Sequence, residues 1–175
     1  MDLSRYRDFK HYSSWSECSK DDEHNEIMIN SEVQVVDFDL VKRKYLNALG
    51  KSEECAASVD VLAEDENGNV YMIEFKNGEI DADNIRKKVT ESLLIYTDIT
   101  HKTIKDTREN LSFILVYNPD RKHFEPQRER AIHLARMGKG LCKEYGLDKY
   151  QGTYFLRAYM MTKEQFANKL LTKLK

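Results

Sequence analysis

The chain has 175 residues, of which 41% are hydrophobic and 33% are charged, and its formal net charge is −2. This length can bury the core of one ordinary domain, and the composition is not that of a disordered protein. The longest apolar runs, such as residues 113–117, are too short to span a membrane. The N-terminal residues lack the apolar stretch of a secretory signal, and the three cysteines show no metal-binding spacing. We therefore expect one globular domain over residues 1–175, located in the cytoplasm.

The charges are unevenly distributed along the chain. Residues 1–80 contain 9 Lys/Arg and 18 Asp/Glu, whereas residues 81–175 contain 19 and 12. One interpretation is two solvated surfaces that attract each other. The other is an acidic site that needs cations beside a basic surface that needs anions, as in a metal-dependent enzyme that acts on nucleic acid. Charge alone does not choose between these interpretations.

The first predicted elements are a short strand and a helix. Alternating apolar residues predict the strand at about 32–37, and helical spacing of apolar residues predicts the helix at about 38–49. Asp37 or Asp39 could cap the start of this helix, and Gly50 is placed to end it.

A hairpin and a second helix follow. Two strands are predicted at about 56–64 and 70–76, and the apolar stripe of the next segment predicts a helix at about 83–98. Asp81 or Asp83 could be the N-cap of that helix.

The last third of the chain continues to mix strands and helices. A buried-strand run occupies 111–117, and a basic helix is predicted at about 125–145. A strand at about 153–160 and a helix at about 162–174 complete the chain. This mixture predicts an α/β or α+β fold with a single sheet.

The loop of the predicted hairpin decides which residues face each other. If residues 66–68 form a three-residue loop with a left-handed glycine, Asp60 lies directly opposite Glu74. A two-residue turn would instead direct Asp60 to the other face of the sheet. Since strand side chains alternate, Glu74 and Lys76 share one face in either case.

In the three-residue register, Asp60 and Glu74 would face each other with Cβ atoms roughly 5 Å apart. Like charges in this arrangement destabilise a sheet unless one is protonated or a cation lies between them. Carboxylate oxygens suit Mg²⁺ or Mn²⁺, and such an ion makes a bound water more acidic. Lys76 could orient or deprotonate that water, or neutralise charge on a phosphate. The alternative is an exposed hairpin on which an acid and a lysine form only a surface ion pair.

These residues resemble a known family. Asp60, then thirteen residues, then Glu74-Phe75-Lys76, on a hairpin followed by a helix and an apolar strand, is similar to the PD-(D/E)XK nuclease superfamily. That superfamily includes restriction endonucleases and Holliday-junction resolvases. The resemblance covers about residues 38–117 and implies a core of a helix, a three-stranded meander, a helix and a further strand. It also implies that Asp60 and Glu74 bind the metal and that Lys76 serves the attacking water.

The chain departs from the superfamily pattern in two places. Val59 stands where the pattern has proline, and no clear strand is predicted between the 38–49 helix and the strand of Asp60. The first meander strand must therefore be short or be supplied by residues 31–37. The superfamily often takes a further acidic metal ligand from its first helix, and the candidates here are Glu26, Glu32 and Asp39.

Two further groups of residues are candidates for contacts with nucleic acid. Asn84 and Lys88 lie four residues apart on the 83–98 helix and could reach the site, as polar residues there do in similar nucleases; a solvated helix flank is the alternative. The region 119–145 is strongly basic and could track a phosphate backbone, but an ordinary charged helix would look the same. The candidates in this region are Arg128, Arg136 and Lys139.

We therefore expect an α/β protein with a restriction-endonuclease-like core, in which a single mixed β-sheet is flanked by helices, followed by a basic part at 118–175. The expected function is hydrolysis of phosphodiester bonds in DNA or RNA with Mg²⁺ or Mn²⁺, at Asp60, Glu74 and Lys76. The alternative is a non-catalytic nucleic-acid-binding or protein-interaction module that retains the nuclease fold. Nucleic acid is the expected partner, the resemblance adds a homodimer, and no membrane is expected.

Overall fold

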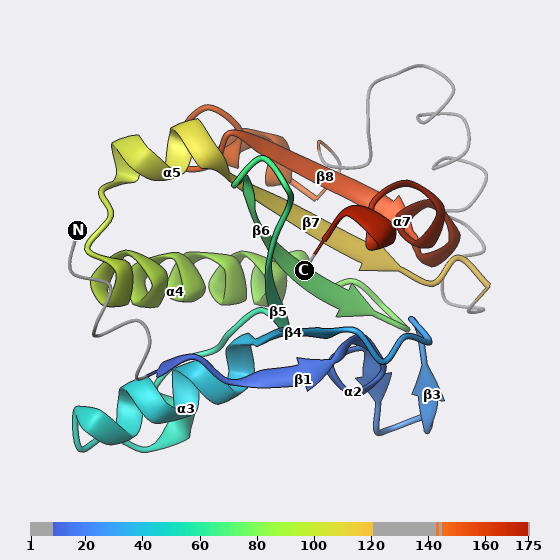
Figure 1. Ribbon diagram of the computed structural model, residues 1–175, viewed down its shortest axis with the longest axis horizontal. Coiled ribbons are helices and arrows are strands. Elements are labelled where there is room, and N and C mark those ends of the chain that lie inside the picture. The colour runs from blue at the N-terminus through green and yellow to red at the C-terminus, as the bar shows by residue number, and fades with distance from the viewer. Residues whose placement is uncertain (1–8, 121–142, 144, 175) are drawn as a thin grey trace.

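The computed structural model describes residues 9–120, 143 and 145–174 (Figure 1). Most of the helix expected at about 125–145, with Arg128, Arg136 and Lys139, lies outside these residues. The predicted contacts of those three side chains with nucleic acid therefore remain predictions.

A six-stranded mixed sheet forms the centre of the described structure (Figure 1). Its strands, in spatial order, are β1 (Tyr12–Ser14), β4 (Gln34–Asp37), β5 (Val61–Glu64), β6 (Val70–Lys76), β7 (Leu111–Tyr117) and β8 (Arg157–Thr162). Neighbours from β1 to β6 run antiparallel, whereas β6, β7 and β8 run parallel. The change of direction thus occurs at β6, the strand that carries Glu74 and Lys76.

Helices cover both faces of this sheet. The α-helices are α2 (Trp15–Cys18), α3 (Phe38–Ala48), α4 (Ala82–Thr100), α5 (Ile104–Asn110) and α7 (Lys163–Lys169), and the 3₁₀ turns are η1 (Glu53–Cys55), η4 (Leu147–Tyr150) and η5 (Leu171–Lys173). Among the described residues, no helix is long and apolar enough to cross a membrane. The mixed α/β architecture with flanking helices is confirmed.

The two faces of the sheet bury different sets of side chains. On one face, apolar residues of α3 and α4 such as Val41, Ile85 and Val89 pack against Met72 of β6. On the other face, the rings of Trp15, Phe75 and Phe166 meet edge to face, with centroids 5.5–6.4 Å apart. Glu74 has the same strand parity as Met72, so it projects toward the α4 face.

Several predicted elements are confirmed. The strands at 70–76 and 111–117 and the helices at 38–49 and 83–98 correspond to β6, β7, α3 and α4. Asp37 caps α3 by accepting from the Leu40 N–H, and Asp81 caps α4. Gly50 follows α3 with a left-handed φ of +67°.

The strand expected at 56–64 begins only at Val61. The backbone N–H groups of Ala57 and Val59 donate to side chains of α4, Glu91 and Ser92, at 2.5 and 2.9 Å. Because these donors are satisfied by α4, they do not join a strand ladder.

The other corrections concern the ends of the chain. The strand expected at 153–160 begins later, as β8, because the residues around Gly152 form turns. The φ of Gly152 is +73°. The helix expected at 162–174 divides into α7 and η5. A second sheet pairs β2 (Lys20–Asp21) with β3 (Glu26–Ile27), so the expected single sheet is corrected to a large and a small one. Two-residue strands are too short to leave a periodic signal in the sequence.

The order of helices and strands also differs from the order that the resemblance implies. Strand β4 precedes α3 and pairs with β5, so it occupies the place of the first meander strand, and β1 pairs with its other edge. Helix α3 therefore lies between β4 and β5 in sequence, whereas the resemblance implies a helix before all three strands of the meander.

Candidate functional site

The β5–β6 hairpin has the predicted three-residue loop. Gly68 is left-handed with a φ of +80°, and the Asp65 N–H donates to the Asn69 carbonyl at 2.9 Å. In the same register Val61 pairs with Ile73, which places the next residues along, Asp60 and Glu74, at facing positions. The predicted register is confirmed.

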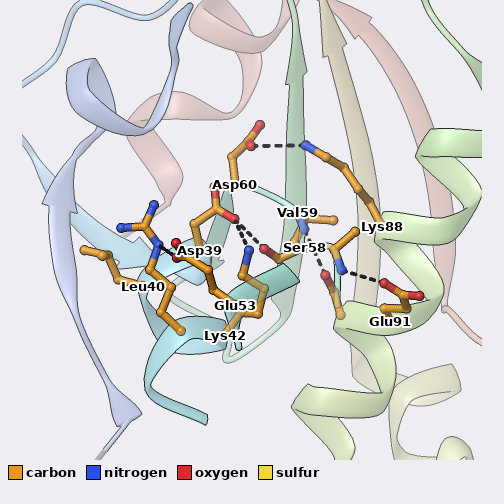
Figure 2. A network of polar contacts seen from close by, with 12 residues as sticks. Asp39, Leu40, Lys42, Glu53, Ser58, Val59, Asp60, Lys88 and Glu91 are labelled. Carbon is orange, nitrogen blue, oxygen red and sulfur yellow. Dashed lines mark hydrogen bonds and ion pairs between the residues drawn. The ribbon is translucent and has the colours of Figure 1, made fainter. Parts of the chain in front are cut away.

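Backbone contacts fix Asp60 at the start of β5. Its N–H donates to the Ile73 carbonyl at 3.1 Å, and its carbonyl accepts from the Phe38 N–H at 2.9 Å. Its carboxylate Oδ2 accepts from the Phe75 N–H at 2.6 Å. The other oxygen, Oδ1, lies 3.8 Å from Nζ of Lys88, as Figure 2 shows. Asp60 is therefore held to both β6 and the start of α3.

Glu74 is fully buried beside two lysines. Its Oε1 accepts from Nζ of Lys88 at 2.7 Å and lies 3.5 Å from Nζ of Lys76. Its Oε2 is also buried and has no hydrogen-bond partner among residues 9–120, 143 and 145–174. A buried carboxylate oxygen without a partner costs free energy, which a proton, a water molecule or a cation at this atom would reduce.

The sequence predicted that Asn84 and Lys88 could both reach the site, and the structure places Lys88 in it. Lys88 projects from α4 toward Asp60 (Figure 2), and its Nζ also contacts Glu74. Asn84 is exposed on the first turn of α4, where its backbone N–H donates to the N-cap Asp81. No contact of its side chain with the site is seen in the described part of the chain. The prediction that Asn84 contacts nucleic acid remains untested.

Of the three candidates for a further acidic ligand, Asp39 lies near Asp60 and Glu74. It is on the first turn of α3, where its Oδ1 accepts from the Ser58 hydroxyl and lies 3.4 Å from Nζ of Lys42. Figure 2 shows it below Asp60. Its charge contributes to raising the pKa of Asp60 and of Glu74, which requires proximity.

The other two candidates for a third acid are engaged elsewhere. Glu32 accepts from the Ser16 hydroxyl at 3.2 Å. Glu26 accepts from the side-chain amides of Asn77 and Asn118 at 3.1 and 3.3 Å. Of the three, Asp39 therefore fits the site best.

Burial and mutual repulsion perturb the titration of the acids. Burial first, and then the charge of Glu74, raise the pKa of Asp60 well above its ordinary value. Burial also raises the pKa of Glu74, against the opposing effects of Lys88 and Lys76. Burial would lower the pKa of Lys88, but the facing carboxylates of Glu74 and Asp60 raise it. The two acids and Lys88 thus behave as one coupled group.

Asp60 and Lys76 line a cleft of about 900 Å³. Residues 20–24 also line the cleft. They belong to an arm formed by β2, β3 and the turn between them, residues 20–27, which we call the β2–β3 arm. The arm is held to the sheet by Asn77, whose amide donates to Asp21 at 3.0 Å and to Glu26 at 3.1 Å. Asp60 and Lys76 therefore face this cleft, whereas the buried Glu74 is not among the residues that line it.

The sequence analysis missed the β2–β3 arm and its anchors. Asn77 and Asn118 directly follow β6 and β7, two adjacent parallel strands, and the Asn118 amide donates to Oδ1 of Asn77 at 2.7 Å. The signal that could have found them is a polar amide at the same end of two buried strands. On the arm, Asp21, Glu23 and His24 also come close to one another, but Asp21 and His24 already pair at 2.7 Å.

The residues at Asp60 include oxygen ligands of the kind that a divalent cation prefers. Mg²⁺ and Mn²⁺ prefer oxygen ligands, and the site offers the carboxylates of Asp60, Glu74 and Asp39. The unpartnered Oε2 of Glu74 is an oxygen ligand that no described residue uses. In the described part of the chain, only Asp21, Glu23 and His24 bring three possible ligand atoms within 4.8 Å of one another, so a metal ion at Asp60, Glu74 and Asp39 stays a prediction.

No protein-family model matches the chain, and the comparisons with curated proteins and with solved structures found no match. The resemblance to PD-(D/E)XK nucleases therefore stays a prediction from the sequence.

Proposed function

We propose that the protein is a metal-dependent nuclease of the PD-(D/E)XK type that hydrolyses phosphodiester bonds of DNA or RNA. The observation that supports this proposal most is the facing pair Asp60 and Glu74, with one buried, unpartnered oxygen and a lysine two residues further along β6. Asp60 and Lys76 of this group line a cleft of about 900 Å³.

Each residue has a distinct role in the proposed reaction. Asp60, Glu74 and Asp39 would hold Mg²⁺ or Mn²⁺, which when bound would acidify water and polarise the phosphate. Lys76 is 23% exposed at the cleft, so its ammonium can donate hydrogen bonds to the attacking water or to a phosphate oxygen. The attack forms a bond from water oxygen to phosphorus and breaks one ester bond, which leaves a phosphate monoester and a hydroxyl group.

A specific observation favours a second candidate function, a non-catalytic binding module. Two carboxylates and two ammonium groups meet around Glu74, so their formal charges balance without any metal ion. A module that binds nucleic acid or protein could retain this network solely as a structural feature.

A cleavage assay tests the proposal. The protein is incubated with single- and double-stranded DNA and RNA in Mg²⁺ or Mn²⁺, with a chelator as the reference. We expect metal-dependent cleavage that Glu74→Gln abolishes, whereas Glu64→Gln, at an exposed acid of the same hairpin, retains it. Absence of cleavage with every substrate and ion, or equal cleavage by Glu74→Gln, would favour the binding module.

A further inference from the structure

Lys88 lies between the two carboxylates of the site. Its Nζ is 2.7 Å from Oε1 of Glu74 and 3.8 Å from Oδ1 of Asp60, and it comes from α4 rather than from the hairpin. Oε1 of Glu74 and Oδ1 of Asp60 are oxygens that could bind one metal ion between the two acids. Both lie beside the Lys88 ammonium group.

We propose that Lys88 is a resident cation that a divalent ion displaces, and that the displaced ammonium then binds the phosphate of the substrate. This inference rests on the proposed function, because it assumes that Asp60 and Glu74 hold a metal ion.

Charge balance explains why the ion and Lys88 exclude each other. The ammonium groups of Lys88 and Lys76 balance the charges of Asp60 and Glu74. A divalent ion added to this set would lie within a few ångströms of the Lys88 ammonium. Glu74 is fully buried, so water and salt screen this repulsion only weakly. The repulsion is relieved when the ammonium moves away.

The surrounding contacts indicate that Lys88 moves and that the acids stay. Asp60 is held by the Phe75 N–H at its carboxylate and by two further backbone hydrogen bonds. Lys88 ends a flexible four-carbon stem, and 22% of its side chain is exposed. The ammonium can therefore leave without unfolding α4 or the hairpin.

Displacement couples the ion to the substrate. Once the ion binds Asp60 and Glu74, the Lys88 ammonium no longer has a carboxylate partner and can accept a phosphate as its counter-ion. The ion should consequently tighten phosphate binding, and by linkage phosphate should tighten ion binding to the same degree.

The first test measures Mn²⁺ affinity without nucleic acid, by the electron paramagnetic resonance signal of the free ion. Lys88→Met removes a charge-assisted hydrogen bond that competes with the ion, so we expect affinity to increase about tenfold or more. Lys88→Arg should stay near the native affinity. Lys87→Met, the same change at the exposed neighbour on α4, should have no effect. A folded Lys88→Met protein with unchanged or weaker Mn²⁺ affinity would overturn the inference.

The second test uses the native protein and does not depend on a variant that folds. Reductive methylation of each lysine is followed by mass spectrometry, with and without saturating Mn²⁺. We expect Lys88 to react faster when the ion is bound, while Lys87 keeps its rate. Unchanged reactivity of Lys88 with the ion bound would also refute displacement.

The outcomes separate this inference from the proposed function. If no variant and no native protein binds Mn²⁺, both are wrong. If Mn²⁺ binds and Lys88 responds as expected but no substrate is cleaved, only the nuclease proposal fails. If cleavage occurs and Lys88 does not respond, only the displacement proposal fails.

Discussion

Replacing Lys88 by methionine should destabilise the metal-free protein. The substitution keeps an unbranched stem of similar length but removes the ammonium that contacts Glu74 at 2.7 Å. Removing one partner of a fully buried ion pair costs about 3–5 kcal/mol, because the other charge is left without compensation. Lys88 is 22% exposed, and Lys76 remains 3.5 Å from the same oxygen. We therefore expect a loss of about 2–3 kcal/mol near neutral pH, below the fully buried case.

The loss of stability caused by Lys88→Met should grow as the pH rises. Burial raises the pKa of both Asp60 and Glu74 in the folded protein, so the folded state holds protons that the unfolded chain releases above about pH 4. Stability therefore falls with rising pH from that value up to the raised pKa. Without Lys88 both pKa values rise further, which extends the fall to higher pH. Below about pH 4 the acids are neutral in both states, and the variant and the native protein should converge.

Urea unfolding in the presence of a chelator, at a series of pH values, measures these free energies. Lys87→Met is the matched control and should change stability by about 0.5 kcal/mol or less, because it alters an exposed side chain. A loss of the same size at every pH would mean that Lys88 acts through packing. Stability equal to that of the native protein would show that the buried ion pair does not exist.

Three further predictions concern the site residue Lys76, the hairpin loop and the thiols. Lys76→Ala should slow cleavage by about 10²-fold or more, because a positioned group is lost, while Mn²⁺ affinity persists; an unchanged single-turnover rate would remove Lys76 from the chemistry. Gly68→Ala should lower the free energy of unfolding by about 1 kcal/mol, because only the φ of +80° opposes the new Cβ, whose nearest contact is 3.6 Å away. A urea midpoint identical to that of the native protein would argue against this loop. Burial and nearby carboxylates raise the pKa of the half-buried Cys18 to about 12, so its thiol should be alkylated more slowly than that of the exposed Cys55; equal rates in peptide mass spectrometry would contradict this raised pKa.

The part of the site on the hairpin could be predicted from the sequence because it depends on local geometry. Loop length and the glycine at position 68 set the register, and the register sets Asp60 against Glu74. The position of Lys88 between the acids depends on how α4 crosses the sheet, which residue spacing on one helix does not specify.

The predictions that were wrong also concern parts of the chain whose structure depends on tertiary contacts. The strand expected from residue 56 was too long because Glu91 and Ser92, more than thirty residues away, satisfy its first backbone donors. The β2–β3 arm was missed because its strands are short and its anchors, Asn77 and Asn118, act only when β6 and β7 lie side by side.

The position of β6 at the change from antiparallel to parallel pairing has a consequence for the order of folding. Its hairpin with β5 closes through three residues, whereas its pairing with β7 must wait for the whole α4 crossover. Because local contacts form sooner than distant ones, Asp60 and Glu74 meet before Lys88 arrives. The docking of α4 is thus the step that neutralises the site, and local opening of α4 in the native state exposes the same two acids. Hydrogen exchange of the α4 amides should accordingly become faster when Mn²⁺ displaces Lys88, because none of the proposed ligands of the ion lies on α4.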